Sequence, residues 1–473
     1  MNRNLLSVKC VLLLAATLLQ LGCRRHPPYI EGPSGPESGR TGVLLTFTGI
    51  ATDPSGDSVA VRFDWGDGDT SEWSAWLAGG ATATDSHSWS VGGSYSVRAQ
   101  AKSASGVLSG WSQALAVTIT EAWTRTFGGA ERDEACAVLQ SSDGGYVVAG
   151  YTVSFGAGES QVYLVKTDAS GNQQWARTYG ASEEGLSARP VANGGYVIAG
   201  RCPGGICLIK TDADGNEVWH KIFVGVDMDY GQSVLEARDG GLVILCRTDQ
   251  RRAGLIKTDS SGNQVWFNTF GGDSVGGVHS LLQASDGGYI FVGEVDEPGG
   301  EEFFDIWLAK ADAYGREVWA KSFATPSSDD YGYSLQPTSD GGYIVAGRVG
   351  ERGIVVHLIK TDGDGNEVWT REFGGPNNVT AHSIQRTSDG GYVVTGHFES
   401  REATSGDVYL LRLDASGDSL WAMSYGGAKD DFGRAVQQTF DGGFVIAGTT
   451  YSYGAGQEDV WLIKTDPQGG VGP

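Results

Sequence analysis

The sequence is poor in positive charge and lacks the long runs of Ala, Leu, Glu and Lys that favour helices. It has 34 Lys and Arg against 57 Asp and Glu, a net charge of −23. Because phosphate binding requires a basic surface, this balance excludes a nucleic-acid partner. An apolar run covers only residues 11–19, too short for a bilayer, which takes about 20 residues. The 73 Gly and the many aromatic residues indicate instead a β-rich protein with many turns.

The N-terminus predicts export. Arg3 and Lys9 precede the apolar run, and Leu21-Gly22-Cys23 follows it, which is the pattern of a secretory signal over residues 1–22. The Cys directly after Gly22 resembles the lipobox of bacterial lipoproteins, although Gln20 stands where that family normally has Leu. The resemblance implies that Cys23 is lipidated and anchors the chain to a membrane. Arg24 is not the Asp of inner-membrane retention, so the implied location is the outer membrane or cell surface. An ordinary signal peptide is the alternative.

Four cysteines remain after Cys23: Cys136, Cys202, Cys207 and Cys246. Cys202 and Cys207 flank a Pro-Gly-Gly-Ile turn, and in an exported protein this spacing allows a hairpin disulfide or two free thiols equally well. Cys136 and Cys246 are expected to be small buried apolar residues.

Residues 23–40 are rich in Pro, Gly and Ser and predict a tether. Residues 41–120 have short alternating segments separated by turns, which predict a small antiparallel β-sandwich. The run Asp64-Trp65-Gly66-Asp67-Gly68, followed by Trp89 and by Gly92-Gly93-Ser94-Tyr95-Ser96-Val97, resembles the PKD domain, an Ig-like module. That resemblance implies a spacer or adhesion module; a fibronectin type III fold is the structural alternative.

Residues 121–473 are a repeat with three anchors. A D-G-G-Y-like turn begins at Asp143, Asn193, Asp239, Asp286, Asp340, Asp389 and Asp441. A K-T-D-like segment begins at Lys166, Lys210, Lys257, Lys310, Lys360, Arg412 and Lys464. The third anchor is a Trp: Trp123, Trp175, Trp219, Trp266, Trp319, Trp369 and Trp421.

The order of these anchors predicts a closed ring. Each unit has four strand-like segments, the first Trp precedes the first D-G-G-Y, and the last K-T-D has no Trp after it. We therefore expect an all-β protein whose C-terminal part is a seven-bladed β-propeller, with the N-terminal Trp strand completing the last blade. The repeats resemble propeller repeats of bacterial and archaeal surface proteins. A parallel β-helix is the competing solenoid.

Two acidic features suggest cation binding. The segment "KTDADGNEVW" (residues 210–219) resembles a calcium loop, but its Gly and Glu are not at the calcium-loop positions, and Gly215 has a counterpart in every repeat. We interpret it as a hairpin turn. The linkers between repeats carry carboxylates that would ring a channel mouth and attract cations such as Ca²⁺, or else cap turns: Asp133, Glu134, Glu183, Glu184, Asp227, Asp229, Asp273, Asp329, Asp330, Asp430 and Asp431.

A variable position lies seven residues before each D-G-G-Y turn, and it is always followed by Ala or Ser. Variation on a regular frame is typical of a binding surface, and ordinary packing variation explains it equally well. The polar members are candidate channel-mouth binding residues: Gln232, His279, Tyr333, His382 and Arg434. No catalytic group or cofactor motif stands out.

These features predict a non-catalytic, lipid-anchored envelope protein that binds or scaffolds protein or carbohydrate. The alternatives are a propeller-type polysaccharide hydrolase or lyase, which would place acids, bases or His at a few channel positions, and an envelope-assembly scaffold.

Overall fold

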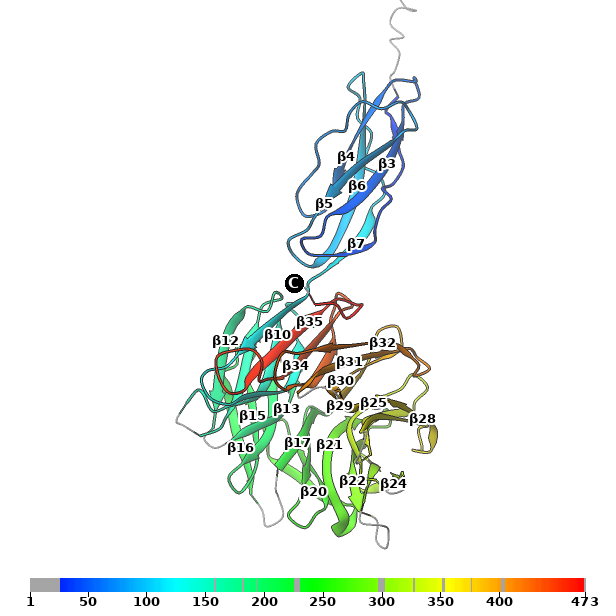
Figure 1. The fold of residues 1–473 in the computed structure, drawn as a ribbon. Helices are drawn as coiled ribbons and strands as arrows, with labels where there is room; N and C mark the ends of the chain where they lie inside the picture. The colour runs from blue at the N-terminus through cyan, green and yellow to red at the C-terminus, as the bar shows by residue number, and fades with distance from the viewer. Residues whose placement is uncertain are drawn as a thin grey trace, which may run out of the picture. The chain divides into compact units, whose positions relative to one another are not determined.

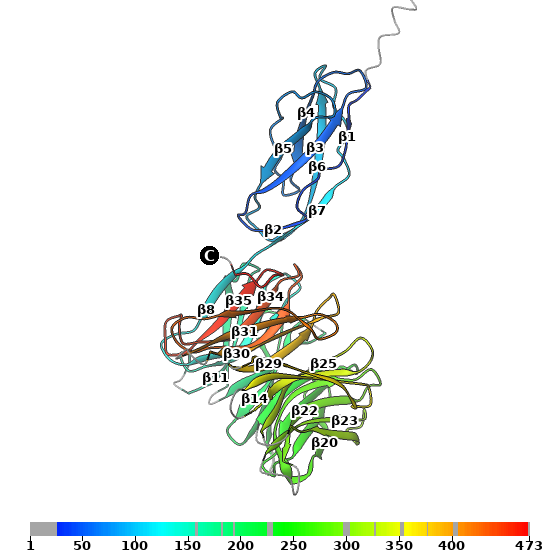
Figure 2. The same ribbon diagram turned by 45° about the vertical axis from the view of Figure 1, so that its right-hand side comes forward.

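The computed structural model describes residues 26–471 apart from 157–158, 181–182, 193, 225–229, 297–302, 326–327, 351–353, 376 and 401–404. The expected signal segment and Cys23 lie outside the described residues. The chain divides into two compact units, residues 1–121 and 122–473 (Figures 1 and 2). The all-β expectation is confirmed, since the described elements are strands apart from one short 3₁₀ turn, η1 (Gly272–Ser274). Nowhere in the described part of the chain is a helix long and apolar enough to cross a membrane.

The first unit contains two packed sheets. One has the order β1 (Tyr29–Ile30), β3 (Leu45–Thr52) and β5 (Thr82–His87); the other has the order β2 (Ser38–Arg40), β7 (Leu115–Thr120), β6 (Gly93–Ser103) and β4 (Val59–Asp64). The alternating apolar residues of these strands meet in one core around Phe47, Trp65 and Trp89. The aromatic residues of the sequence motif therefore serve packing.

The prediction of a tether over residues 23–40 is wrong for two segments from Tyr29 onward, which are strands. Tyr29–Ile30 pairs with β3, and Ser38–Arg40 pairs in parallel with β7. Ile30 is buried in the core of the first unit. A Pro- and Gly-rich composition suggested a linker, but a few extended residues can add an edge strand to a sheet wherever the neighbouring strand is free.

The described part of the second unit contains seven four-stranded antiparallel sheets in a propeller-like arrangement (Figure 1). Sheet 1 is β9 (Asp133–Gln140), β10 (Tyr146–Thr152), β11 (Gln161–Thr167) and β12 (Gln173–Tyr179). Sheet 2 is β13 (Glu184–Pro190), β14 (Tyr196–Cys202), β15 (Gly205–Thr211) and β16 (Glu217–Val224). Sheet 3 is β17 (Tyr230–Glu236), β18 (Leu242–Arg247), β19 (Ala253–Thr258) and β20 (Gln264–Phe270). Sheet 4 is β21 (Val275–Gln283), β22 (Tyr289–Asp296), β23 (Phe304–Ala311) and β24 (Glu317–Phe323).

Sheet 5 is β25 (Asp330–Pro337), β26 (Tyr343–Val349), β27 (Val355–Thr361) and β28 (Glu367–Phe373). Sheet 6 is β29 (Asn378–Arg386), β30 (Tyr392–Glu399), β31 (Gly406–Leu413) and β32 (Ser419–Tyr425). Sheet 7 is β33 (Asp431–Gln438), β34 (Phe444–Thr450) and β35 (Asp459–Thr465), and its fourth strand is β8 (Trp123–Phe127) from the start of the unit. The expected pairing of the N-terminal Trp strand with the last K-T-D strand is thus present, with Trp123 opposite Lys464.

The K-T-D and D-G-G-Y anchors form an ion pair within six of the seven sheets. The cation of the third strand lies 2.5–2.8 Å from the turn Asp that precedes the second strand, in the pairs Lys166–Asp143, Lys257–Asp239, Lys310–Asp286, Lys360–Asp340, Arg412–Asp389 and Lys464–Asp441. The remaining repeat has Asn193 in place of the Asp. The recurring Lys is therefore a structural residue that ties the turn to the middle of the sheet.

The Trp anchor packs between neighbouring sheets. Each Trp ring lies against the Gly of the hairpin turn in the next sheet: Trp123–Gly171, Trp175–Gly215, Trp219–Gly262, Trp266–Gly315, Trp319–Gly365, Trp369–Gly417 and Trp421–Gly469. A Cβ on Gly215 would lie 2.7 Å from the Trp175 ring, and the backbone there has a φ of 75°. Both observations require glycine. Because Trp123 of sheet 7 contacts Gly171 of sheet 1, the contacts continue across the two ends of the repeat.

The segment at residues 210–219 is a hairpin turn, as interpreted. Asp212 Oδ1 accepts hydrogen bonds from the backbone N–H groups of Asp214 and Asn216, at 3.0 and 2.8 Å, and Oδ2 accepts one from the Asn216 amide at 2.9 Å. Asp212 is therefore occupied in holding its own turn.

The disulfide that the spacing of Cys202 and Cys207 allowed is absent, and both thiols are free. In the β14–β15 pairing Cys202 is opposite Gly205 and Cys207 is opposite Gly200. The two cysteines are thus diagonal neighbours, for which side chains are about 7–8 Å apart, whereas a bridge needs Cβ atoms within about 4.5 Å. Burial raises the pKa of Cys202 to about 11 and that of Cys246 to about 12.

Candidate functional site: the central channel

The innermost strands of the seven sheets enclose one cavity of about 180 Å³. Its lining includes all seven variable residues that the sequence singled out: Cys136, Leu186, Gln232, His279, Tyr333, His382 and Arg434. The structure thus brings together the five candidate binding residues, which come from five different sheets. Cys136 was expected to be an apolar core residue, but it is part of this polar lining, and burial raises its pKa to about 12.

Each of these residues is the extra residue of a β-bulge. In every sheet, the register between the first and second strands shifts by one at this position; for example, Gly332 pairs with Gly347 and Ser334 with Ala346, so Tyr333 has no partner. The same shift leaves out the corresponding residue of the other six sheets. A bulge redirects a side chain that regular pairing would point elsewhere. The repeated bulge therefore explains how seven side chains of different size reach one cavity.

The bulge also explains the glycine in the second strand of most repeats. A Cβ on Gly347 would lie 1.8 Å from the Tyr331 carbonyl oxygen, and Gly200, Gly396 and Gly448 have the same clash with Glu184, Thr380 and Phe432. Sheet 3 is the exception, because Cys246 occupies this position and its sulfur lies over Gly254 of the third strand.

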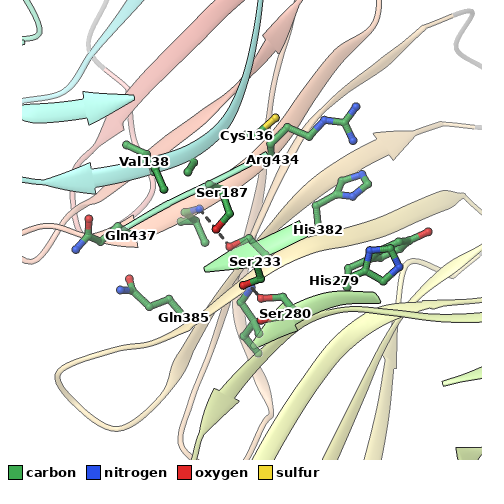
Figure 3. A pocket seen from close by; sticks show the side chains of 18 of the residues that line it. Cys136, Val138, Ser187, Ser233, His279, Ser280, His382, Gln385, Arg434 and Gln437 are labelled. Carbon is green, nitrogen blue, oxygen red and sulfur yellow. Dashed lines mark hydrogen bonds between the residues drawn. The ribbon is translucent and has the colours of Figure 1, made fainter. Parts of the chain in front are cut away.

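The cavity has three levels along its length (Figure 3). Cys136, His279, His382 and Arg434 lie at one end, Ser187, Ser233 and Ser280 lie in the middle, and Gln385 and Gln437 lie at the other end. The middle level links neighbouring sheets, since Ser334 Oγ accepts a hydrogen bond of 3.1 Å from Ile384 N–H. At the Gln end, Gln437 Oε1 accepts a hydrogen bond of 2.6 Å from Gln140 N–H, which joins sheet 7 to sheet 1.

The end formed by the bulge residues, here called the channel mouth, is aromatic and basic. Among the described residues the cavity lining contains the basic side chains Arg189, His279, His382 and Arg434 but no Asp or Glu. The rings of His279 and Tyr333 lie 5.0 Å apart, and those of Tyr333 and His382 lie 5.4 Å apart. Burial, together with Arg434 and three other basic groups nearby, holds the pKa of His382 well below its usual 6.5. His382 is therefore neutral at pH 7 and can donate or accept a hydrogen bond.

A second row of functional side chains escaped the sequence reasoning. It consists of the residue after the glycine position in each second strand: Tyr151, Arg201, Arg247, Glu294, Arg348, His397 and Thr449. Glu294 Oε2 lies 2.8 Å from His279 Nε2, and Arg348 packs over the Tyr331 ring at 4.4 Å. The available signal was the variation of this single position directly after a residue that is Gly in six of the seven repeats.

The described part of the acidic linkers does not form a ring of free carboxylates at the mouth. Asp227 and Asp229 lie outside the described residues, and none of the other linker carboxylates lines the cavity. Asp133 and Asp431 are fully buried and accept hydrogen bonds from the linker N–H groups of Gly129 and Gly427. Asp330 accepts hydrogen bonds from Thr325 and Ser328. The described carboxylates thus mainly hold the linkers, which is the turn-capping alternative.

The remaining linker carboxylates also have local partners. Glu134 pairs with Arg132, Glu183 lies 3.2 Å from His220, and Asp273 lies 2.7 Å from Arg252. Asp329 and Asp430 accept hydrogen bonds from the N–H groups of Phe304 and Gly406. Glu184 is opposite Arg201 in the β13–β14 pairing. No group of three or more metal-binding side chains occurs within the described ranges, so the weak Ca²⁺ expectation gains no ligand set there.

The comparisons with known proteins assign neither a family nor an activity to this chain. No family model and no curated protein matches the chain. A solved PKD domain of an M14-like peptidase from a Thermoplasmatales archaeon is 39% identical over 20% of this chain and 97% of its own, with a TM-score of 0.19. A protein from Lactobacillus plantarum is 11% identical over 78% of this chain and 96% of its own, with a TM-score of 0.47.

A GH43 β-xylosidase/α-arabinofuranosidase from a compost metagenome is 11% identical over 51% of this chain and 93% of its own, with a TM-score of 0.31. Likenesses of this strength assign no chemistry to the channel. The chain is thus an all-β protein with many four-stranded sheets, and its structural neighbours include a PKD domain and propeller-like proteins.

Proposed function

We propose that the protein is a non-catalytic, lipid-anchored protein of the cell envelope, and that its channel mouth binds protein or carbohydrate. In this proposal, residues 41–120 are the body of an Ig-like, PKD-like module, and residues 121–473 are a closed seven-bladed β-propeller. The seven Trp–Gly contacts support the closed ring, because they run from each sheet to the next and from the last to the first.

One observation is the main support for the proposed binding function. Seven bulges, one per sheet, direct seven side chains of six chemical kinds into a single cavity. Packing alone would favour the same small residue in every repeat, as it does at the next position, where every repeat has Ala or Ser. Convergent polar groups in a preformed cavity are the usual features of a ligand site.

A polysaccharide hydrolase or lyase is the second candidate. Hydrolysis needs two carboxyl groups facing the scissile bond, and the described cavity lining has none. A lyase needs a base that removes the proton from C5 of a uronate, after which the C4–O bond breaks, a C4=C5 double bond forms and the leaving oxygen takes up a proton. His279, Tyr333 and His382 have the chemistry of such a base, so ultraviolet absorbance of an unsaturated product from any polyuronate would replace the non-catalytic proposal. An envelope-assembly scaffold would instead co-purify with membrane proteins.

The binding proposal predicts the result of a glycan-array and pull-down screen with matched variants. Tyr333→Ala should weaken binding of every channel ligand tenfold or more, because a central aromatic contact contributes about 2 kcal/mol. Tyr314→Ala is the control, since Tyr314 is an exposed tyrosine in a hairpin turn outside the channel. Ligands that bind the two variants equally well would place the binding surface elsewhere.

The anchoring proposal has a separate test. Cells given radiolabelled fatty acid should incorporate the label into the protein, and the Cys23→Ala variant should lose all of it, because acylation needs the thiol. A label that persists in Cys23→Ala, or never enters the protein, contradicts lipidation at this residue.

A further inference from the structure

The side chains around His382 form a connected group from four sheets. His279, Tyr333 and His382 are in ring contact, and Arg434 of the next sheet acts electrostatically on both His382 and Cys136. Figure 3 shows His279, His382, Arg434 and Cys136 at the same end of the cavity. A ligand entering the mouth therefore meets this group directly.

The cations of this group lack carboxylate partners. Within the described residues neither guanidinium forms an ion pair: Arg434 packs over the Phe432 ring at 5.3 Å, and Arg348 over the Tyr331 ring at 4.4 Å. Nε of Arg348 is buried and has no hydrogen-bond partner in the described part of the chain. Among the carboxylates near the group, Glu294 is directed at His279, and Glu134 and Glu184 act electrostatically on Cys136.

This arrangement is unusual in a chain of net charge −23. Charged groups removed from water are stabilised when an opposite charge or hydrogen-bond acceptors accompany them. Carboxylates are abundant in this sequence, yet the described cavity lining contains none. Burial is the main cause of the low pKa of His382, and the basic groups around it add to the effect because they disfavour one more positive charge. An anion at the mouth would compensate Arg434, which lines the cavity.

We propose that the channel mouth binds the oxyanion of an acidic saccharide, with the anion held by Arg434 and His382 and the sugar ring beside Tyr333. This inference rests on the proposed binding function and names its ligand class. The cavity of about 180 Å³ is smaller than the pockets that enclose drug-sized ligands, so it accommodates the end of a chain or a single sugar residue. Arginine and a neutral imidazole are suited to oxyanions, since both donate hydrogen bonds to them. The oxyanion comes from a uronate carboxylate or from a phosphate ester.

The test is isothermal titration of the purified protein with three probes: a galacturonate trimer, a galactose trimer and galactose 6-phosphate. We expect at least one acidic probe to bind and the neutral trimer not to bind. Arg434→Gln should weaken that binding tenfold or more, because it removes a charge-assisted contact to the anion. Arg316→Gln, which changes an exposed arginine paired with Asp312 in a hairpin turn, should bind like the wild type. Added salt should weaken binding through screening.

The outcomes separate this inference from the function on which it rests. Binding by galactose 6-phosphate alone identifies a phosphate ester as the oxyanion, and binding by the galacturonate trimer alone identifies a carboxylate. Equal binding of the neutral and acidic trimers, or an Arg434→Gln variant of unchanged affinity, overturns the oxyanion site even where Tyr333→Ala abolishes binding. A protein whose ligands are all insensitive to Tyr333→Ala overturns the proposed binding function itself.

Discussion

Gly347→Ala is expected to destabilise the second unit by about 3 kcal/mol, in the upper part of the range for overpacking. The added Cβ would lie 1.8 Å from the carbonyl oxygen of Tyr331. That oxygen belongs to the backbone next to the bulge, so no side-chain rotation can relieve the contact. The strands must separate instead, which also displaces Tyr333 at the channel mouth. Urea unfolding followed by tryptophan fluorescence measures the loss of stability.

Gly363→Ala is the matched control for this substitution. Gly363 lies in a hairpin turn where other repeats already have alanine: Ala169, Ala213, Ala313 and Ala415. Its φ is not in the left-handed region, and its Cβ would approach only the Gly341 carbonyl oxygen, at 3.1 Å. We expect no loss of stability, or a gain of about 0.5 kcal/mol from the less flexible unfolded chain. Equal effects of the two variants would contradict the steric role assigned to Gly347.

Trp123→Ala should cost roughly 3–5 kcal/mol, the range for removing a large buried aromatic side chain. Trp123 is 8% exposed, lies 5.6 Å from the Tyr146 ring and covers Gly171 of sheet 1. It belongs to β8, the strand that completes sheet 7 from the opposite end of the repeat. Its loss therefore weakens the contact between the last and first sheets, and the free edge of β35 becomes available for pairing with other chains.

Thr124→Ala controls for changes in β8 itself. Thr124 is the next residue of the strand, is exposed and lies opposite Ile463. We expect a change within about 0.5 kcal/mol, as for most surface substitutions. Limited proteolysis provides a second readout, since cleavage within residues 122–127 should accelerate in Trp123→Ala alone. Unchanged stability and cleavage in Trp123→Ala would show that closure of the seven sheets does not depend on the contact between Trp123 and Gly171.

The residues of the channel were predictable in identity but not in geometry. The variable position before each D-G-G-Y turn could be found by aligning the repeats, because the anchors fix which residues of the repeats correspond. The bulge that turns Tyr333 or His382 into the cavity could not be found in this way, since a bulge is a mismatch between two strands and depends on their pairing. The second row, with Glu294 and Arg348, was missed because it becomes part of the site only through that same pairing.

The alternatives that the sequence left open, and the tether that it predicted too long, have a related cause. The acidic linkers were expected either to ring the channel mouth or to cap turns, and Asp133 and Asp431 accept hydrogen bonds from the N–H groups of Gly129 and Gly427 in their own linkers. Cys202 and Cys207 are close in sequence, yet the register of their hairpin places them diagonally. Ser38–Arg40 has the composition of a tether but pairs with the free edge of β7. In each case the residue types were as expected, but their partners in the folded chain determined their role.

The sequence by itself determined the all-β class, the repeat of three anchors and the pairing of the first Trp strand with the last K-T-D strand. These features depend on local turn chemistry and on spacing along the chain, which a single sequence displays directly. Tertiary structure alone decided which side chains enter the channel, which carboxylates accept hydrogen bonds within their own linkers and which of the described cations lack a carboxylate partner. Those properties depend on strand register and on neighbours from other repeats, about 50 residues away in the chain, and spacing within one repeat does not contain them.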